Sequence, residues 1–293
     1  MRIITLSENM VSEYSSPAIM MGEYGEWNFR LLGGRGEWGL SILVEADDHR
    51  ILLDTGSHGA AVHNAELMGI DLSRVDKIVL SHGHCDHTGG LREVLRKMRK
   101  NVEIIAHPAI WSSKYFRIDN GTYAYDEIPF QREELETLGA SFNLSKEPVW
   151  ITENVATSGE ISMVTEYEKI DPIFYVKEKD QFHPDPLLDD QALFIKDKKG
   201  LVIILGCCHR GIVNTLNHAK KLTGVEKIYA IVGGTHLAGA SKERLELTIS
   251  ELKASDIQKL GVSHCTGMAT SMKLAQVFGD KFFFNNAGTI TEI

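Results

Sequence analysis

The sequence predicts an α/β fold in which apolar strands alternate with helices. Four times an apolar run is followed by a loop that carries histidine and then by a helical pattern, with the loops beginning near residues 81, 206, 233 and 263. Between residues 111 and 190 this alternation is lost, because aromatic and charged residues are mixed without a dominant period. The chain is therefore predicted to form one αβ unit from residues 1–110 and 191–293, with a small α+β insertion at residues 111–190.

In the first half, the clearest local prediction is a β-hairpin. Leu40–Glu45 and Arg50–Leu53 are apolar runs, and the turn signal Asp47-Asp48 separates them. Leu91–Met98 has apolar residues at helical spacing and basic residues on its other faces, as expected of a helix packed on a sheet. The remaining elements predicted here are strands at Arg2–Leu6, Val75–Leu80 and Val102–Ala106, a helix at Ala60–Met68, and a loop at Gly22–Gly39.

In the insertion and the second half, the predicted elements follow the same rules of period and turn chemistry. The insertion is predicted to hold a helix at Gln131–Leu138 and strand-like runs at Val149–Ile151 and Ile173–Val176. The second half is predicted to hold strands at Ala192–Ile195, Leu201–Leu205, Lys227–Val232, Ile257–Val262 and Lys281–Phe284, and helices at Ile212–Leu222, Ser241–Ala254 and before Phe278.

A dense cluster of metal-binding residue types follows the strand Val75–Leu80. The stretch SHGHCDHTGG contains His82, His84, Asp86 and His87, and imidazole nitrogens and carboxylate oxygens suit zinc, manganese or iron. In an extended stretch His82 and His84 point to the same side, so they can hold one ion together, whereas Asp86 and His87 lie beyond the bend. A histidine-rich surface turn without a metal is the alternative interpretation.

The later histidine loops are expected to complete this site, because ligand sites gather at the strand ends of αβ sheets. We expect His209 to join His82 and His84 around one ion, and His264 to join Asp86 and His87 around a second ion. Two divalent ions, expected to be zinc with manganese or iron as alternatives, would share an acidified hydroxide that acts as the nucleophile. His236 is expected to act as a general acid or a substrate contact, with a simple loop cap as the alternative.

Several further residues remain open as ligands or as lining. Each of the four cysteines lies beside a candidate ligand, which indicates reduced thiols near a metal in a reducing compartment. We favour a lining role for the thiols, with Cys207 as the strongest candidate for a ligand. Asp190 could also be a ligand in place of His209, and His107 is a weaker candidate because it precedes Pro108 in a loop.

Two helix starts could receive a phosphate. Arg210 precedes the helix Ile212–Leu222, and Thr266-Gly267 precedes the last helix. Backbone N–H groups and the helix dipole favour anions at such positions, so we expect Arg210, Thr266 and Gly267 to contact the substrate.

Composition restricts the classes of partner. The formal net charge is -9, and phosphate-backbone binding needs clustered Lys and Arg, so a general nucleic-acid surface is not expected. The apolar run at Ile3–Leu6 is too short for a signal peptide, and no stretch approaches the length of a membrane helix. We therefore expect a cytoplasmic protein. A homodimer is compatible with the sequence, although no apolar face for it can be identified.

The HxHxDH pattern at residues 82–87 resembles the signature of the metallo-β-lactamase superfamily. The combination GCCHRGIVNTL, GGTHL and SHCTG resembles, more narrowly, the branch of metal-dependent hydrolases named after the 7,8-dihydropterin-6-methyl-4-(β-D-ribofuranosyl)aminobenzene-5'-phosphate synthases. The resemblance spans residues 40–288 and implies an αββα sandwich. It also implies a structural position for Asp54 near the metals, for which a plain turn cap is the alternative. The usual bridging aspartate is replaced by Gly206-Cys207 in this chain.

In this superfamily, insertions shape the choice of substrate. The resemblance therefore implies that aromatic and basic side chains of the insertion line the substrate pocket. A small local core would explain the aromatic residues equally well. These candidates are Trp111, Tyr115, Phe116, Arg117, Tyr123 and Tyr125.

Three functions remain on these grounds. The leading hypothesis is a dinuclear metal-dependent hydrolase or transferase that acts on a phosphoester, diphosphate or ester. A dihydropterin phosphate is one candidate substrate, since aromatic residues could stack on a pterin. A diiron oxidoreductase is less consistent with the sequence, because the chain leaves little room for a flavin domain. A non-catalytic protein, in which a metal stabilises a ligand-binding or redox-sensing module, is the remaining alternative.

Overall fold

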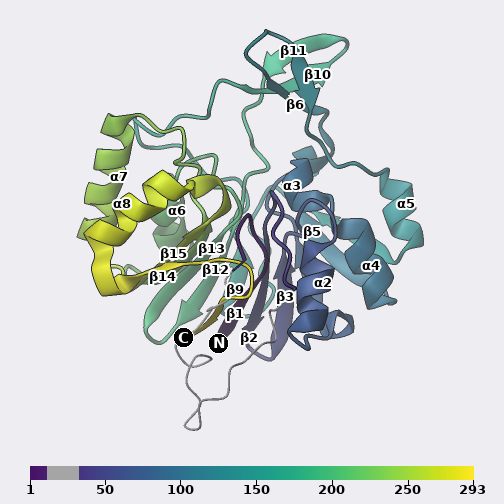
Figure 1. The fold of residues 1–293 in the computed structure, drawn as a ribbon, viewed down its shortest axis with the longest axis horizontal. Helices are drawn as coiled ribbons and strands as arrows, with labels where there is room; N and C mark the ends of the chain where they lie inside the picture. Colours follow the sequence, from purple (N-terminus) through teal and green to yellow (C-terminus); the bar gives the residue numbers. More distant parts are fainter. Residues whose placement is uncertain (12–32) are drawn as a thin grey trace.

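The computed structural model describes residues 1–11 and 33–293, and most of the predicted loop Gly22–Gly39 lies outside them. Two β-sheets lie face to face, and helices cover the outer side of each sheet (Figure 1). The first sheet has seven strands in the order β17 (Ile290–Glu292), β1 (Arg2–Ser7), β2 (Ser41–Ala46), β3 (His49–Leu53), β4 (Lys77–Val79), β5 (Val102–Ala106) and β8 (Ala140–Leu144). The second has six, in the order β16 (Phe282–Phe284), β15 (Lys259–Ser263), β14 (Ile228–Gly234), β13 (Gly200–Leu205), β12 (Ala192–Asp197) and β9 (Val155–Thr157).

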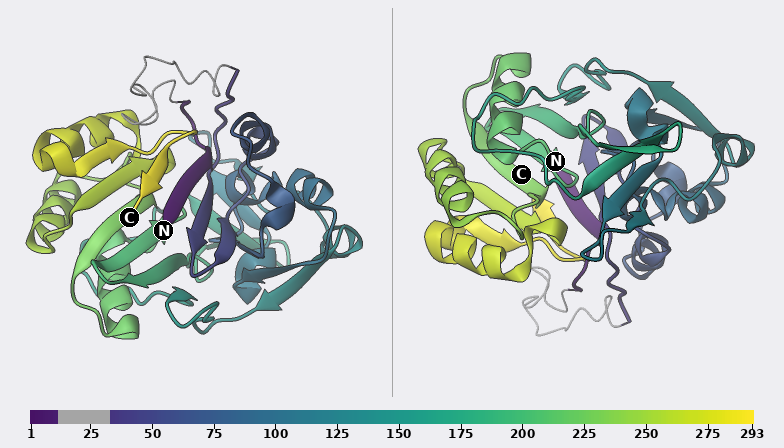
Figure 2. Two further views of the ribbon diagram at one scale, coloured as in Figure 1. Left: turned by 90° about the horizontal axis from the view of Figure 1, so that it is seen from below. Right: turned by 90° about the horizontal axis from the view of Figure 1, so that it is seen from above.

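The helices divide between the two outer faces, as the views from above and below also show (Figure 2). On the side of the first sheet are α2 (Ala60–Leu67), α3 (Cys85–Thr88), α4 (Leu91–Met98) and α5 (Arg132–Thr137). On the side of the second are α6 (Ile212–Thr223), α7 (Lys242–Ala254) and α8 (Met268–Phe278). None of the helices that the structure describes is long and apolar enough to cross a membrane.

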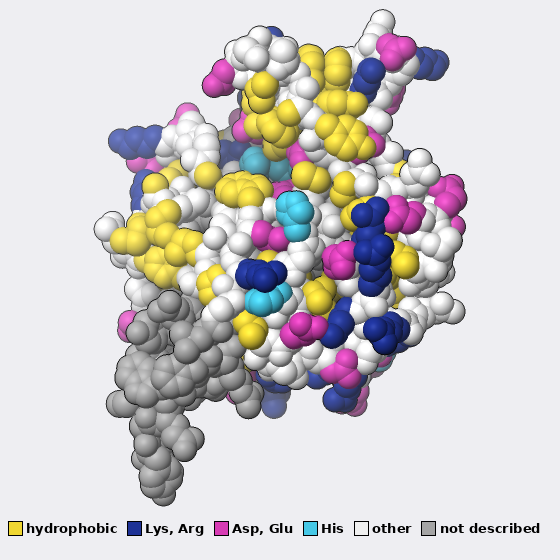
Figure 3. All heavy atoms as spheres, turned by 45° about the vertical axis from the view of Figure 1, so that its right-hand side comes forward, with side chains coloured by type: hydrophobic (Ala, Val, Ile, Leu, Met, Phe, Trp, Pro, Cys, Tyr) yellow, Lys and Arg dark blue, Asp and Glu magenta, His cyan; other side chains and the backbone are white. Residues whose placement is uncertain are grey.

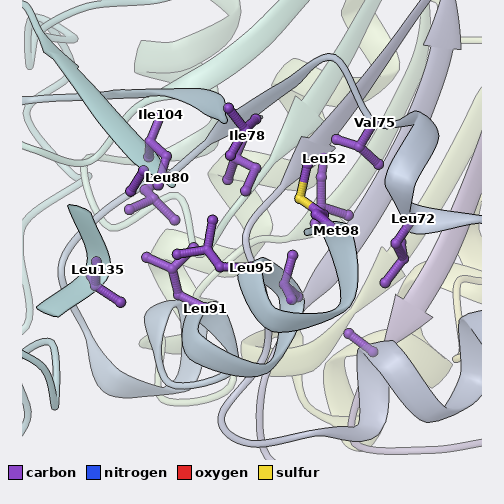
Figure 4. Close-up of a cluster of buried hydrophobic side chains, with 14 of the residues drawn as sticks. Leu52, Leu72, Val75, Ile78, Leu80, Leu91, Leu95, Met98, Ile104 and Leu135 are labelled. Atoms are coloured by element: carbon purple, nitrogen blue, oxygen red, sulfur yellow. The ribbon is translucent and has the colours of Figure 1, made fainter. Parts of the chain in front are cut away.

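The strands are apolar on both sides because both sides are covered. In β2, Ile42 and Val44 belong to the core between the sheets, whereas Leu43 faces the helices. In α4, Leu91, Leu95 and Met98 pack against Leu52, Ile78 and Leu80 beneath the first sheet (Figure 4). Strands covered on both faces read as continuous apolar runs, which explains why the sequence pattern is strong in both halves. The predicted αββα sandwich is confirmed.

The insertion forms a third, small sheet above one edge of the sandwich (Figure 1). Its strands, in spatial order, are β11 (Gln181–Pro184), β10 (Phe174–Glu178), β6 (Lys114–Arg117) and β7 (Tyr123–Tyr125). Two other strands between residues 111 and 190 belong to the sandwich itself, since β8 joins the first sheet and β9 joins the second. Division of the chain at residues 110 and 190 stays a prediction. The segment between them contributes strands to the sandwich as well as the small sheet.

A few local predictions differ from the structure. Of Val149–Ile151, only Trp150 makes a β-bridge, to Ala156, and the run forms no strand. The C-terminal strand β17 was not predicted, and it pairs with β1 across almost the full length of the sequence. A three-residue edge strand has too little periodic pattern to be recognised from sequence.

Candidate metal centre

The histidine loops lie at the same edge of the sandwich because the strands before them are parallel. β3, β4 and β5 are parallel in the first sheet, and β13, β14 and β15 are parallel in the second. Parallel strands end at a common edge, where the loops after β4, β13 and β15 meet. The small sheet of the insertion overhangs this edge (Figure 1).

Three histidines form what we call the first group: His82, His84 and His209. One nitrogen from each lies within 4.8 Å of one from each of the others, and all three residues are buried. The Nε2 atoms of His82 and His209 are 3.2 Å apart, although 127 residues separate them in sequence. Nε2 of His84 is buried and has no hydrogen-bond partner among the described residues.

Four residues form the second group: Asp86, His87, Cys207 and His264, whose donor atoms also lie within 4.8 Å of one another. His87 Nε2 lies 3.1 Å from Cys207 Sγ. His264 Nε2 lies 3.1 Å from an oxygen of Asp86 but makes no hydrogen bond in the described part of the chain. Four donor atoms that converge this closely fit a common ion, and nitrogen, carboxylate and thiolate are all zinc ligands.

Asp54 connects the two groups from behind. Its Oδ2 accepts a hydrogen bond from His87 Nδ1 (2.6 Å) and another from the Ser81 hydroxyl (2.7 Å). The Ser81 oxygen in turn lies 2.9 Å from His82 Nδ1 and is left to accept its proton. Both imidazoles thereby keep a proton on Nδ1 and direct Nε2 to the centre, as metal-binding histidines require. Asp54 therefore has the structural position that the superfamily resemblance implies.

His264 is oriented by two residues that the sequence analysis missed. Its Nδ1 donates to Asn9 Oδ1 (3.0 Å), and its backbone N–H donates to Glu8 Oε1 (2.6 Å). Asn9 and Glu8 directly follow β1, so a polar pair after a buried strand was the only available signal. Asn9 lies 255 residues from His264 along the chain, so the two residues could not have been paired from sequence.

The electrostatics of the two groups are opposite. Burial lowers the pKa of all three first-group histidines well below the ordinary value, and the neighbouring imidazoles add to this shift. Burial also opposes ionisation in the second group, but the charges of Asp86 and Asp54 outweigh it and raise the pKa of His87 to about 9. Although burial disfavours the Asp86 carboxylate, His87 and His264 hold its pKa below the usual range. The first group is thus neutral at pH 7, whereas the second contains an ion pair.

Backbone strain is concentrated in the loops of the centre. Asp54, Cys208, His236 and His264 all have left-handed conformations, with φ between 47° and 60°. Non-glycine residues in this region cost roughly 1–3 kcal/mol each and persist where the surroundings impose them, commonly at functional sites. In His236 this conformation lets the backbone N–H donate a hydrogen bond to Cys265 Sγ (3.2 Å).

His236 lies beside the first group rather than in it. Its ring centroid is 4.2 Å from that of His209, and its buried Nδ1 has no partner among the described residues. Donor atoms of His236, His209 and Cys207 also fall within 4.8 Å of one another. This position suits a contact to a bound substrate, and it equally suits a further metal ligand.

A cavity of about 580 Å³ opens onto both groups. Figure 3 shows histidine and acidic side chains in the hollow beneath the overhanging small sheet, whose apolar side chains project above it. Of the predicted aromatic and basic pocket residues of the insertion, Phe116 lines this cavity, and the other five do not. Three further residues line the cavity and were not predicted: Trp38, Ile173 and Phe174. The ring of Phe174 stacks on that of His84 with the centroids 4.9 Å apart, and the ring centroids of Trp38 and His264 are 5.1 Å apart.

Asp126 is a further lining residue that the sequence did not single out. Its Oδ1 accepts from Cys85 Sγ (3.3 Å), and Oδ2 lies 3.8 Å from His84 Nε2. Burial, supported by the nearby Asp86 charge, raises the pKa of Asp126 to about 7. The residue follows β7 in an irregular segment, so no local pattern marked it.

The predicted anion site at Arg210 is used by the protein itself. The guanidinium donates to the carbonyl oxygens of Ile161 and Pro186, each at 2.6 Å. At the start of α6, the N–H groups of Val213 and Asn214 donate to the buried carboxylate of Glu168. The helix start therefore already holds an anion, which corrects the expectation that Arg210 faces a phosphate.

Other predicted contacts also lie outside the cavity. The Thr266 hydroxyl accepts from the backbone N–H of Thr235 (3.2 Å) and is fully buried, and neither Thr266 nor Gly267 lines the cavity. His107 accepts from the backbone N–H of Ala109 and contacts Glu160 at 3.0 Å, away from both groups. Asp190 uses Oδ2 to accept from the backbone N–H of Arg210 (2.9 Å), and it is absent from the clustered ligand sets of the described residues.

Comparisons with known proteins agree with this architecture. The family model described as "Metallo-beta-lactamase superfamily" matches residues 37–172. The chain is 34% identical over 260 residues to the 7,8-dihydropterin-6-methyl-4-(beta-D-ribofuranosyl)-aminobenzene-5'-phosphate synthase of Methanocaldococcus jannaschii, covering 86% of this chain and 88% of that protein. It is 31% identical over 255 residues to an uncharacterized protein of the same organism, MJ0448, covering 87% and 93% respectively.

Solved structures show the same fold. Tm1679, described as a metal-dependent hydrolase of the beta-lactamase superfamily, superposes with a TM-score of 0.80 at 25% identity, covering 100% of this chain and 99% of that one. Zn(2+)-bound PqqB from Methylobacterium extorquens, with a TM-score of 0.55 and 11% identity over the whole of both chains, shares the fold alone. The shared motifs, the sandwich and the long match to the synthase lead to one conclusion: the chain belongs to the metallo-β-lactamase superfamily, in the branch that resembles the dihydropterin-phosphate synthases.

Proposed function

We propose that the protein is a dinuclear metal-dependent hydrolase or transferase that acts on a small phosphorylated, pterin-like molecule. The observation that carries the proposal is the convergence of two groups of buried donor atoms at the bottom of one cavity. In this proposal, His82, His84 and His209 hold one divalent ion, and Asp86, His87 and His264 hold the other. Cys207 is the candidate for an additional ligand, because it belongs to the second group and also clusters with His209.

The donor set fits divalent ions, with zinc expected and manganese or iron as alternatives. Two such ions would acidify a water molecule and polarise the bond that is broken. The protein would position them through Asp54, which fixes the Nδ1 proton of His87 and, through Ser81, that of His82. Asp86, ionised at neutral pH, would supply negative charge beside the reacting group.

The cavity supports a substrate with an anionic end and a flat apolar part. Among its described lining residues there is no Lys or Arg, so the negative charge of a phosphate would be met by the ions and imidazoles. Trp38, Phe116 and Phe174 provide aromatic surface in the same cavity, which suits a flat ring. The related synthase is named for a product that carries both a dihydropterin and a phosphate, and the proposed substrate class follows that name.

His236 is the proposed proton donor to the leaving group. It lines the cavity, and its buried Nδ1 has no partner among the described residues and could carry the transferred proton. If His236 binds a metal instead, replacing it would lower the metal content as well as turnover. Replacement by Gln, with metal content measured beside turnover, separates these two roles.

Elemental analysis and a substrate screen test the proposal together. We expect close to two metal ions per chain and turnover of a phosphoester or a pterin phosphate. His82→Ala and Asp86→Ala should lose most turnover while remaining folded by circular dichroism. Full activity in either folded variant, or a wild-type protein that takes up no divalent metal, would refute the proposal. Turnover with water as the only other reactant indicates a hydrolase, whereas dependence on a second substrate indicates a transferase.

A non-catalytic role in ligand binding or redox sensing has one observation in its favour. All four cysteines are unpaired, and the buried Cys207 and Cys265 lie at the centre itself. Tight binding of a pterin or nucleotide without conversion, together with metal loss on mild oxidation, would favour that role. Turnover that survives oxidation would exclude it.

A further inference from the structure

A fully buried lysine connects the insertion to the metal centre. Lys114 begins strand β6 of the small sheet and is 1% exposed. Its Nζ donates to Asp185 Oδ2 at 2.8 Å and to Asp189 Oδ1 at 2.9 Å. Both carboxylates are also buried. Burying charged groups is costly even when they pair, so this arrangement is poorly explained by stability alone.

The second oxygen of Asp189 reaches the metal loop. Asp189 Oδ2 accepts a hydrogen bond from the backbone N–H of Gly83 at 2.8 Å. Gly83 lies between His82 and His84, the two first-group histidines of the motif. Lys114 fixes one oxygen of Asp189, and the other oxygen then fixes the peptide that joins the two ligands.

The loop is pressed closely onto this support. A Cβ added at Gly83 would lie 2.5 Å from the Ile110 carbonyl oxygen and 3.0 Å from Lys114 Cε. A glycine is therefore needed at this position, chiefly because the loop packs against the Ile110 backbone, with the lysine stem also in close contact. The neighbouring residue Gln191 holds the same loop, since its N–H donates to Ser81 O and its side chain donates to Leu80 O.

Residues adjacent to Asp189 also hold the loop of the third ligand. Asp190 Oδ2 accepts from the backbone N–H of Arg210, the residue after His209. Asp189 and Asp190 thus hold, side by side, the two loops that supply the first group. None of the hydrogen bonds that Lys114, Asp189 and Asp190 make among the described residues reaches a member of the second group.

From this geometry we propose that Lys114, acting through Asp189, positions the first group for metal binding, so that the insertion sets the affinity of one metal site and not of the other. The inference rests on the proposed metal centre. Lys114 touches no substrate in this proposal and is a positioning residue. The insertion would then be part of the metal centre as well as a wall of the cavity.

Titration of the metal-free protein with Co²⁺, followed by visible absorption and chelator competition, tests this. The variant His84→Ala identifies which of the two binding steps belongs to the first group. Lys114→Met should weaken that same step roughly 10- to 100-fold, the usual effect of losing a residue that orients a ligand, and leave the other step unchanged. Asp189→Asn, which keeps side-chain volume, should weaken the same step. Lys177→Met is the matched control, because Lys177 lies in the same small sheet but pairs with the exposed Asp180.

Two results would overturn the inference. The first is wild-type affinity at both steps in folded Lys114→Met and Asp189→Asn, and the second is equal weakening of both steps, which indicates only a general structural role. If Lys114→Met does not fold, Asp189→Asn decides. A wild-type protein that binds no Co²⁺ refutes the proposed metal centre itself, whereas two wild-type steps that ignore these substitutions refute only the role of Lys114.

Discussion

The first and second groups are built from neighbouring residues of one motif, yet they differ in charge. His82 and His84 join a third imidazole, and burial keeps all three neutral. Asp86 and His87 join a thiol and His264, and there a buried carboxylate keeps the imidazole of His87 protonated. The first group is therefore ready to bind a cation, whereas the second must release a proton to do so.

The largest effect is expected where the two groups are linked. Asp54→Ala removes the acceptor for His87 and Ser81 and leaves buried polar groups unpaired. Removing one partner of a buried pair costs about 3–5 kcal/mol, so the free energy of unfolding should fall by about that amount. Metal content should fall in both groups. Denaturant unfolding and elemental analysis measure the two effects, and a variant that loses metal from one group only would break the proposed link.

Loss of one ligand should separate the groups. His264→Ala is expected to reduce the metal content from close to two ions to close to one, because the second group alone loses a donor. His107→Ala serves as the control, since His107 is a buried loop histidine bound to Glu160 and Ala109. Two ions retained in His264→Ala would mean that this histidine is not a ligand.

A thiolate in the second group should be visible by spectroscopy. If Cys207 is a ligand, the Co²⁺-loaded protein should show a sulfur-to-cobalt charge-transfer band in the near ultraviolet, and Cys207→Ser should remove it. Cys208→Ser should retain it, because the Cys208 thiol contacts Thr215 (3.3 Å) instead. A band that persists in Cys207→Ser would assign the thiol to the lining.

The smallest expected effect is a difference between the two groups in the number of protons released when a metal binds. At pH 7 the first group is already neutral, so loading it should release no proton from its histidines. Because the pKa of His87 is raised to about 9, its imidazole is protonated at pH 7 and must lose that proton when it becomes a ligand. Affinity in the second group should therefore rise with pH up to about pH 9. Calorimetry in buffers of different ionisation enthalpy counts the protons, and equal release from both steps would contradict the contrast.

Sequence patterns predicted much of this protein because they report local geometry. Continuous apolar runs predicted most of the sandwich strands, a period-3.6 pattern predicted the amphipathic α4 helix, and the spacing of His82 and His84 placed both rings on one side. The helix start at Arg210 shows the limit of the same reasoning. The local pattern was that of an anion site, but Glu168, distant from it in sequence, already binds those N–H groups. The cytoplasmic location, the absence of a nucleic-acid partner and a homodimer stay predictions.

The sequence alone was enough to predict the superfamily, the alternation of strands and helices, and the motif that supplies four candidate ligands from one loop. The contacts between distant parts of the chain could be known only from the folded structure: His209 beside His82, Asn9 on His264, and Lys114 with Asp189 beneath Gly83. Local spacing fixes the direction of neighbouring side chains, whereas the distance between strand ends far apart in sequence depends on sheet order, register and packing.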